Sequence, residues 1–387
     1  MNRFNSLISA YGATLSTKDV EILQELFSLD ASASLLKFNP FIWGESAPLY
    51  YSTIADTRFT LFKMPKSSHV LGQYRKGKMM KTLKEFPVDL PLDPSVEYED
   101  RPDLYDPRFI LFTLYHLLGP ENAINSNQII KLNGLSIALM TTSSENASMR
   151  NLGYLVLERF FYHLEGSKSS SAIYFWVHFI DCYRSSLNST NQQVPFLLNS
   201  LLIEIIEIVD TPKDSLFYAI KDFVTAKPKL DSYQITLLFK NLLTTKDLEW
   251  KKCQKLVLNL LSRCIKSDED FEICKTNDLC RYILSIYSSN WCDLNDKICI
   301  LKFIKSCIRL PKVAKVFLIE YGLTVWLTNI VASLDSKDPS EQDELKDLVK
   351  ILQKSCRNTD LPKNCYKQQL KMLKVWVKFS ESSSVTS

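Results

Sequence analysis

The sequence predicts an all-α protein built from armadillo/HEAT-like helical repeats, an α-solenoid. From about residue 109 to the end, apolar residues follow the helical period and not the alternation of a strand. Glycine is scarce, with 9 residues where average usage would give about 27, so tight turns are rare. Residues 271–286 align with 317–330 at an offset of about 45 residues, typical of such repeats. A globular helical bundle is the alternative.

The N-terminal part combines helical and irregular sequence. Residues 6–29 predict a helix pair, or one helix broken at Gly12, with Ser16 and Thr17 as candidate N-caps. An irregular segment is expected near residues 87–107, because five prolines interrupt regular structure there: Pro87, Pro91, Pro94, Pro102 and Pro107. We therefore expect a domain boundary, with residues 1–105 forming an N-terminal region and 106–387 the armadillo-like repeat domain.

Helices are expected almost continuously from Asp106 onward. Between residues 256 and 265 the apolar positions follow i, i+1, i+4, i+5, i+8 and i+9, which forms a wide stripe on one side of a helix. The same pattern recurs at 198–209. The predicted helices span 149–164, 171–187, 194–210, 214–226, 231–244, 248–266, 278–288, 295–309, 312–333, 341–356 and 362–379.

The composition is that of an ordinary globular protein, with 46% hydrophobic and 23% charged residues. A net charge of +4 is too small to indicate a nucleic-acid-binding protein by itself. No apolar run approaches the ~18 residues that a membrane-spanning helix needs, and the N-terminus lacks the pattern of a secretion signal. We expect a soluble intracellular protein.

The motifs of common enzyme classes are absent from the sequence. It has no GxxxxGKS/T phosphate loop, GxGxxG turn, GxSxG nucleophile elbow or HExxH zinc helix. His178 and Asp181 have a spacing that can orient an imidazole, but their apolar neighbours favour a packed histidine. We expect no enzymatic activity, no cofactor and no small-molecule substrate.

The cysteines predict buried thiols and no metal site. The chain has ten, without a CxxC pair, and seven of them fall between residues 253 and 307 at irregular spacing. No histidine follows His178 to complete a zinc-binding set. In a reducing compartment such thiols act as small hydrophobic side chains.

A basic segment is the first candidate nucleic-acid-binding site. It has no carboxylate, and Phe62, His69 and Tyr74 lie among its cations, a mixture suited to phosphate contact and base stacking. Met80, Leu83 and Phe86 are expected to pack against the fold. The alternatives are a solvated surface, or internal pairing with the acidic segment that follows from Asp89 to Asp106. The candidate residues are Lys63, Lys66, Arg75, Lys76, Lys78, Lys81 and Lys84.

A lysine stripe on the last predicted helix is the second candidate. Tyr366, Leu370, Leu373 and Val377 form the apolar side of this helix. A simple solvated face is the alternative, since cations are favoured near a helix C-terminus. The stripe starts at Lys363, and its candidate RNA-binding residues are Lys367, Lys371, Lys374 and Lys378.

Several stretches resemble the C-terminal domain of the nucleolar pre-ribosomal-associated protein family, also called the unhealthy ribosome biogenesis proteins. Their order and spacing match those of the family over roughly residues 7–165, whereas the rest resembles it only as generic helical repeat. None of these motifs is catalytic. They are YGATLS at 11–16 with Asp19, KMMKTLKEFP at 78–87, YDPRF at 105–109, LGPE at 118–121, and Met149-Arg150 followed by LERFFYHLE at 157–165.

The resemblance implies a non-enzymatic scaffold that is located in the nucleolus and acts in early assembly of the large (60S) ribosomal subunit. Implied partners are pre-60S assembly factors including a DEAD-box helicase, with pre-ribosomal RNA or small nucleolar RNA as further candidates. Family members are several times longer, which implies a terminal fragment or an excised domain. The alternative function is an armadillo-like adaptor that binds protein peptides in transport or signalling, without salt-sensitive RNA affinity.

Overall fold

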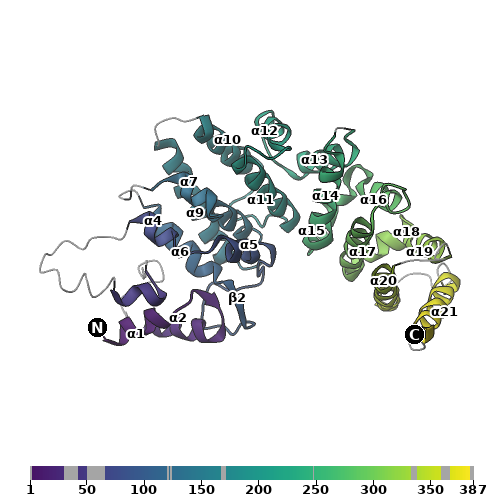
Figure 1. The fold of residues 1–387 in the computed structure, drawn as a ribbon, viewed down its shortest axis with the longest axis horizontal. Coiled ribbons are helices and arrows are strands. Elements are labelled where there is room, and N and C mark those ends of the chain that lie inside the picture. Colours follow the sequence, from purple (N-terminus) through teal and green to yellow (C-terminus); the bar gives the residue numbers. More distant parts are fainter. Residues whose placement is uncertain are drawn as a thin grey trace, which may run out of the picture. The chain divides into compact units, whose positions relative to one another are not determined.

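The computed structural model describes residues 2–29, 42–49, 66–119, 122, 124–166, 171–246, 248–332, 338–358 and 367–383. Regular structure in these residues is almost entirely helical, with one pair of short strands, which confirms the all-α prediction (Figure 1). Within these ranges no single helix is long and apolar enough to cross a membrane. The helices 311–319 and 323–332, bent by 66°, reach that length and composition only as a pair.

The chain divides into two compact units. Unit 1 comprises residues 1–194 and 202–230, and unit 2 comprises 195–201 and 231–387. The elements of unit 1 are α1 (Asn2–Ala10), β1 (Thr14–Leu15), α2 (Thr17–Leu29), η1 (Gly44–Ser46), α4 (Ser67–Leu71), α5 (Lys76–Lys84), β2 (Arg101–Tyr105), α6 (Pro107–Leu117), α7 (Ser126–Lys131), α8 (Gly134–Thr141), α9 (Ala147–Gly166), α10 (Ser171–Ser185), most of α11 (Phe196–Asp210) and α12 (Phe217–Thr225).

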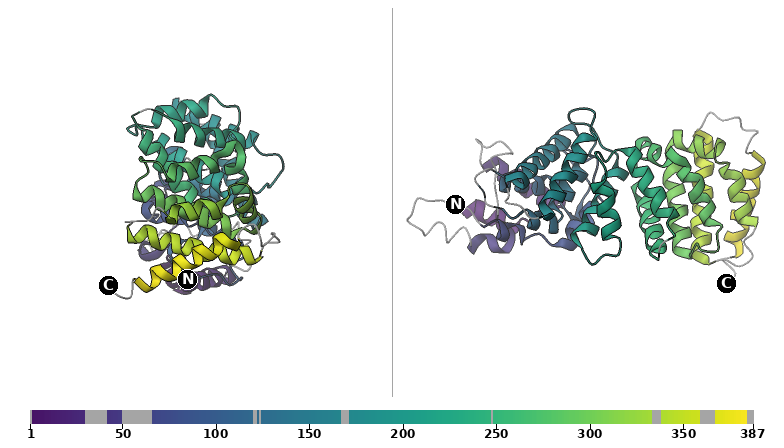
Figure 2. Two further views of the ribbon diagram at one scale, coloured as in Figure 1. Left: turned by 90° about the vertical axis from the view of Figure 1, so that its right-hand side faces the viewer. Right: turned by 90° about the horizontal axis from the view of Figure 1, so that it is seen from above.

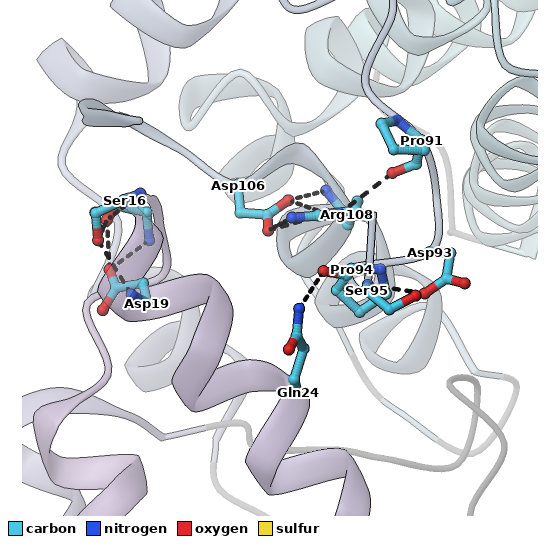
Figure 3. Close-up of polar contacts among 10 residues, drawn as sticks. Ser16, Asp19, Gln24, Pro91, Asp93, Pro94, Ser95, Asp106 and Arg108 are labelled. Atoms are coloured by element: carbon cyan, nitrogen blue, oxygen red, sulfur yellow. Dashed lines mark hydrogen bonds and ion pairs between the residues drawn. The ribbon is translucent and has the colours of Figure 1, made fainter. Parts of the chain in front are cut away.

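Unit 1 opens with the predicted helix pair, which is broken after Ala10. Ser16 caps α2, since its Oγ accepts a hydrogen bond from the backbone N–H of Asp19 at 3.2 Å. The buried Asp19 carboxylate in turn accepts the N–H groups of Gly12 at 3.0 Å and Thr14 at 2.9 Å. A Cβ at Gly12 would lie only 2.9 Å from this carboxylate. The YGATLS motif is therefore a turn wrapped around one buried acid (Figure 3).

The Pro-rich segment is more regular than the sequence predicts. Residues 101–105 form β2, which pairs antiparallel with β1. Pro107 does not interrupt a helix but begins α6, because proline at the first helical position lacks only an N–H that would be unpaired anyway. The predicted boundary between residues 105 and 106 consequently falls inside unit 1.

A buried ion pair joins this segment to the N-terminal turn. Asp106 caps α6, and its carboxylate accepts hydrogen bonds from the backbone N–H of Arg108 at 2.9 Å and from the guanidinium at 2.8–3.0 Å. Both side chains are 1% exposed. The N–H of Asp106 donates to the carbonyl of Ala13 at 2.9 Å, and Arg108 also reaches the carbonyl of Pro91 (Figure 3). Contacts of these two residues thus connect three separate stretches of chain, around residues 13, 91 and 106–108.

Helices α6, α8 and α9 form the centre of unit 1. Every residue of α8 is buried, so this helix has no solvent-exposed face. Gly153 of α9 allows close packing, since a Cβ there would meet the carbonyl oxygen of Ala138 and the Thr141 side chain at 3.1 Å. Several side chains of the 149–165 motif stabilise these helices by binding carbonyl groups. Arg150, for example, donates to the carbonyl oxygens of Ser144, Glu145 and Asn191.

Unit 2 is a succession of helices that lie side by side (Figure 2). The predicted helix at 312–333 is wrong as a single element, because the chain turns at Gly322, whose φ of +58° lies in the left-handed region. The predicted ranges also omit α15. The elements are α13 (Ser232–Thr244), α14 (Trp250–Cys264), α15 (Asp268–Lys275), η2 (Thr276–Asp278), α16 (Leu279–Tyr287), α17 (Leu294–Arg309), α18 (Pro311–Ile319), α19 (Leu323–Ala332), α20 (Pro339–Asn358) and α21 (Lys367–Ser383).

Helices in unit 2 recur at a nearly constant spacing. The helices α14, α17 and α20 begin at residues 250, 294 and 339, so successive starts are 44 and 45 residues apart. The sequence alignment pairs Phe271 with Phe317, and the centroids of these two rings lie 5.7 Å apart. Asp278 before α16 and Gly322 before α19 both have φ near +57°. The spacing agrees with an armadillo- or HEAT-like repeat, whose exact type stays a prediction.

The first turns of α17 and α20 carry equivalent buried carboxylates. Asp296 of α17 forms an ion pair with Lys251 of α14. Glu341 of α20 accepts a hydrogen bond from the Tyr287 hydroxyl at 2.6 Å and lies 3.7 Å from Lys297 of α17. Each carboxylate therefore joins its own helix to one from the preceding group of helices.

Candidate interaction surfaces

The basic segment lies mainly on α5 and the turn before it. Lys63 is outside the described residues, and Lys66 immediately precedes α4. On α5 the buried apolar residues are Met79 and Leu83, followed by Phe86, whereas Met80 is only half-buried. The predicted packing side is therefore correct for Leu83 and Phe86, and one position off at Met80.

Two cations of the segment are used inside unit 1. Lys78 Nζ donates to the carbonyl of Pro102 at 2.8 Å and lies 4.9 Å from the centre of the Tyr105 ring. Lys81 forms an ion pair with Asp103 at 2.8 Å, and this contact lowers the pKa of the Asp103 carboxyl. Internal pairing with the acidic segment thus accounts for these two residues.

The other four cations of the segment are exposed. We call Lys66, Arg75, Lys76 and Lys84 the basic surface; none forms an ion pair with another described residue. Fewer aromatic side chains are available for base stacking than the sequence predicts. Tyr74 is buried and donates to Thr113 at 3.2 Å, Phe62 is outside the described residues, and His69 is exposed. The basic surface therefore offers charge for phosphates, with one exposed imidazole nearby in sequence.

The lysine stripe lies on α21. Lys367, Lys371 and Lys374 are exposed, Leu370, Leu373 and Val377 are buried as predicted, and Lys363, Tyr366 and the Lys378 side chain are outside the described residues. The exposed side is not purely basic, because Met372 and Val375 are about half exposed. It consequently combines charge with apolar area.

His178 has a structural role. Its Nε2 lies 3.2 Å from the carbonyl oxygen of Val224 and 3.3 Å from Sγ of Cys182, whose thiol donates to the carbonyl of Lys227 at 3.1 Å. Asp181 pairs instead with Arg184 at 2.6 Å. The histidine and the thiol therefore tie α10 to the C-terminal end of α12. Sequence reasoning considered Asp181 but missed Cys182, one turn away at i+4.

The cysteines of the described residues are free, and all but the half-buried Cys299 are buried. Burial raises the thiol pKa of Cys280 and of Cys292 to about 12, so both are protonated near neutral pH. Cys365 is outside the described residues. Within those same ranges no group of three or more His, Cys, Asp or Glu side chains is placed to hold a metal ion.

Comparisons with known proteins identify relatives of the chain. A family model described as nucleolar pre-ribosomal-associated protein 1 matches residues 135–326. The proteins of that name from Homo sapiens and Mus musculus are each 24% identical to the chain, over 343 and 348 residues that cover 86% of it. The chain spans 15% of the length of each relative. No solved structure matches it significantly.

These matches agree with the motifs found in the sequence. The human and mouse relatives are named as nucleolar proteins, in agreement with the expected location, and the family description is not that of an enzyme. The region matched by the family model includes all of α9, the helix that carries the Met149-Arg150 and 157–165 motifs. The chain is therefore similar to the nucleolar pre-ribosomal-associated protein family that its sequence indicates.

Proposed function

We propose that this chain is a non-enzymatic scaffold in early nucleolar assembly of the large (60S) ribosomal subunit. The names of its relatives support a role in ribosome biogenesis. Its two helical units, one of them built from regularly spaced helices, provide extended surface for other assembly factors. Following the family resemblance, the proposed partners are pre-60S factors including a DEAD-box helicase.

We further propose that unit 1 contacts pre-ribosomal or small nucleolar RNA through the basic surface. The supporting observation is that Lys66, Arg75, Lys76 and Lys84 are exposed, and none pairs with a carboxylate among the residues that the structure describes. An unpaired cation that binds a phosphate releases condensed counterions, which favours binding and makes it sensitive to salt. On α21, Lys367, Lys371, Lys374 and Lys378 are a second proposed RNA contact.

The test is RNA binding by the full chain and a triple variant, Arg75, Lys76 and Lys84→Glu. Lys78 and Lys81 are left unchanged because they bind Pro102 and Asp103. Fluorescence anisotropy with labelled pre-ribosomal RNA fragments should show affinity falling tenfold or more at moderate salt. The slope of log K against log salt should decrease by about 2, since each contact to single-stranded RNA contributes about 0.7.

A matched control places the same charge change on exposed lysines elsewhere, Lys213, Lys246 and Lys315→Glu. This variant should retain most of the affinity and the full salt slope. If both triple variants lose affinity equally, binding depends only on net charge. If neither loses affinity, the basic surface does not bind RNA, and the peptide-binding adaptor becomes the better description of the chain.

A further inference from the structure

An open groove of about 810 Å³ lies in unit 1, beside α9 and the end of α6. Its volume is within the range of ligand-binding clefts. Four lining residues belong to the 157–165 motif, and no residue of the basic surface lines it. The lining residues include Tyr115, Ile124, Leu155, Glu158, Arg159 and Tyr162.

Arg159 is a cation of this groove without a carboxylate partner. Its guanidinium lies 3.4 Å from the centre of the Tyr115 ring, and Nη1 donates to the Tyr115 carbonyl at 2.6 Å. Among the described residues it forms no ion pair. A guanidinium has five N–H donors in a planar fork suited to a carboxylate. The stacked Arg159 therefore has donors left for an anionic group in the groove.

Apolar and aromatic residues line the groove beside Arg159, together with the polar Asn122, Glu158 and His163. The half-buried Ile124 and Leu155 supply aliphatic surface, and Tyr162 is 62% exposed. Exposed tyrosine beside aliphatic residues and an arginine is typical of surfaces that anchor a protein partner. One apolar side chain with an adjacent carboxylate would complement this arrangement in both polarity and charge.

We propose that this groove binds a short linear segment of a protein partner that carries an apolar residue next to Asp or Glu. The apolar side chain packs against Ile124 and Leu155, and the carboxylate binds Arg159. Exposed Glu158 at the groove accepts backbone N–H groups of the segment. The inference does not depend on RNA binding by the basic surface.

A protein segment fits the groove better than single-stranded RNA. RNA recognition relies on open aromatic faces for base stacking, but Arg159 already covers one face of the Tyr115 ring. The aliphatic residues have no counterpart in a nucleotide, and the Glu158 carboxylate would repel a phosphodiester. These three features favour a peptide ligand.

The experiment selects peptides from a random dodecapeptide phage library on the full chain. The strongest sequence is synthesised with a fluorescent label, once as selected and once with Asp and Glu replaced by Asn and Gln. We expect selected sequences to combine an aliphatic or aromatic residue with an adjacent acid. The acidic form should bind at least tenfold more tightly than its amide form.

Arg159→Gln should reduce the affinity for the acidic peptide to that of the amide form, and should hardly change binding of the amide form. Arg184→Gln is the control, because Arg184 also lies over an aromatic ring, that of Phe161, but does not line the groove. It should bind both peptides as the unchanged chain does. Melting curves check folding, and Arg159→Lys and the amide peptide remain informative if Arg159→Gln is unstable.

Three results would overturn the proposal. The selected peptides could lack acidic residues, or the acidic peptide could bind Arg159→Gln as tightly as the unchanged chain. Alternatively, a labelled 12-nucleotide oligouridine could depend on Arg159 while no peptide does, which would make the groove a nucleic-acid site. Loss of RNA binding in the Arg75, Lys76 and Lys84→Glu variant leaves the peptide result unaffected, so the two proposals fail separately.

Discussion

Unit 1 and unit 2 both bury carboxylates, but they do so in different settings. In unit 1, Asp106 pairs with Arg108 where both are almost inaccessible to water, and their surroundings come from three separate stretches of chain. In unit 2, Asp296 and Glu341 lie at equivalent places in the first turns of α17 and α20, each near a lysine of an earlier helix.

The difference shows two ways in which ion pairs can fix the arrangement of segments in a helical protein. A unique buried pair specifies a single arrangement of irregular segments, and it is costly to break because the remaining charge would be stranded without water. Repeated links whose lysines are partly exposed each contribute less, and neighbouring repeats provide similar links. Substitutions in unit 1 should therefore have larger effects than comparable ones in unit 2.

The largest effect is expected for Arg108→Ala. Removing this guanidinium leaves the Asp106 carboxylate buried without its partner, which should lower the free energy of unfolding of unit 1 by about 3–5 kcal/mol. Urea unfolding followed by peptide-resolved hydrogen exchange measures each unit separately. Arg184→Ala is the control, since its ion pair is exposed and should contribute less than about 1 kcal/mol. Equal effects of the two variants would contradict the proposed contrast.

Asp296→Ala in unit 2 should lower the free energy of unfolding by a smaller amount, about 2–3 kcal/mol. This change removes the partner of Lys251, and the Asp293–Asp296 capping box at the start of α17. Lys251 keeps Asp293 at 3.5 Å, which limits the loss. Hydrogen exchange should increase first in α14 and α17. A loss as large as that of Arg108→Ala would show that the repeated links are not redundant.

Gly12→Ala should destabilise unit 1 by about 1–2 kcal/mol, because its Cβ would press on the Asp19 carboxylate. Gly77 is a matched control on α5, where a Cβ meets nothing within 4 Å among the described atoms. Gly77→Ala should stabilise by roughly 0.5–1 kcal/mol through the helix preference of alanine. Thermal melting of both variants decides whether close approach to Asp19 requires glycine.

The smallest effect concerns the thiols of unit 2. Burial raises the pKa of Cys280 and Cys292 to about 12, so their stabilising protonated state is retained at neutral pH. This contribution should decrease only as the pH rises from about 9, the ordinary thiol value, toward 12. Iodoacetamide labelling at pH 8 should modify Cys299 well before these two, as read by mass spectrometry. Equal labelling rates would contradict the burial.

How much of the fold the sequence predicts depends on how local the determining contacts are. The helices of unit 2 follow from apolar periodicity, and the alignment of residues 271–286 with 317–330 places Phe271 and Phe317 in contact. Ile319 is an exception, since it is 60% exposed although its aligned partner Ile273 is buried. The turn at Gly322 was missed because one glycine in a long apolar stretch is a weak signal.

Long-range contacts explain what the sequence could not predict. Proline content correctly marks residues 87–107 as unusual, but the pairing of β2 with β1 requires knowledge of a partner about 90 positions away. The count of cations from Lys63 to Lys84 does not reveal that Lys78 and Lys81 are used internally. Arg159 stands in a recognised motif, yet only its stacking on Tyr115 suggests a binding groove.

The link between Ala13 and Asp106 has a consequence for the order of folding during synthesis. These residues are 93 positions apart, so the N-terminal turn must wait for more than ninety further residues before it finds its partner. In unit 2, Lys251 meets Asp296 after only 45 residues. Contacts of long sequence separation form slowly because the loop must close first. We therefore expect chaperones to shield the nascent chain of unit 1 from aggregation for longer than they shield each helical repeat of unit 2.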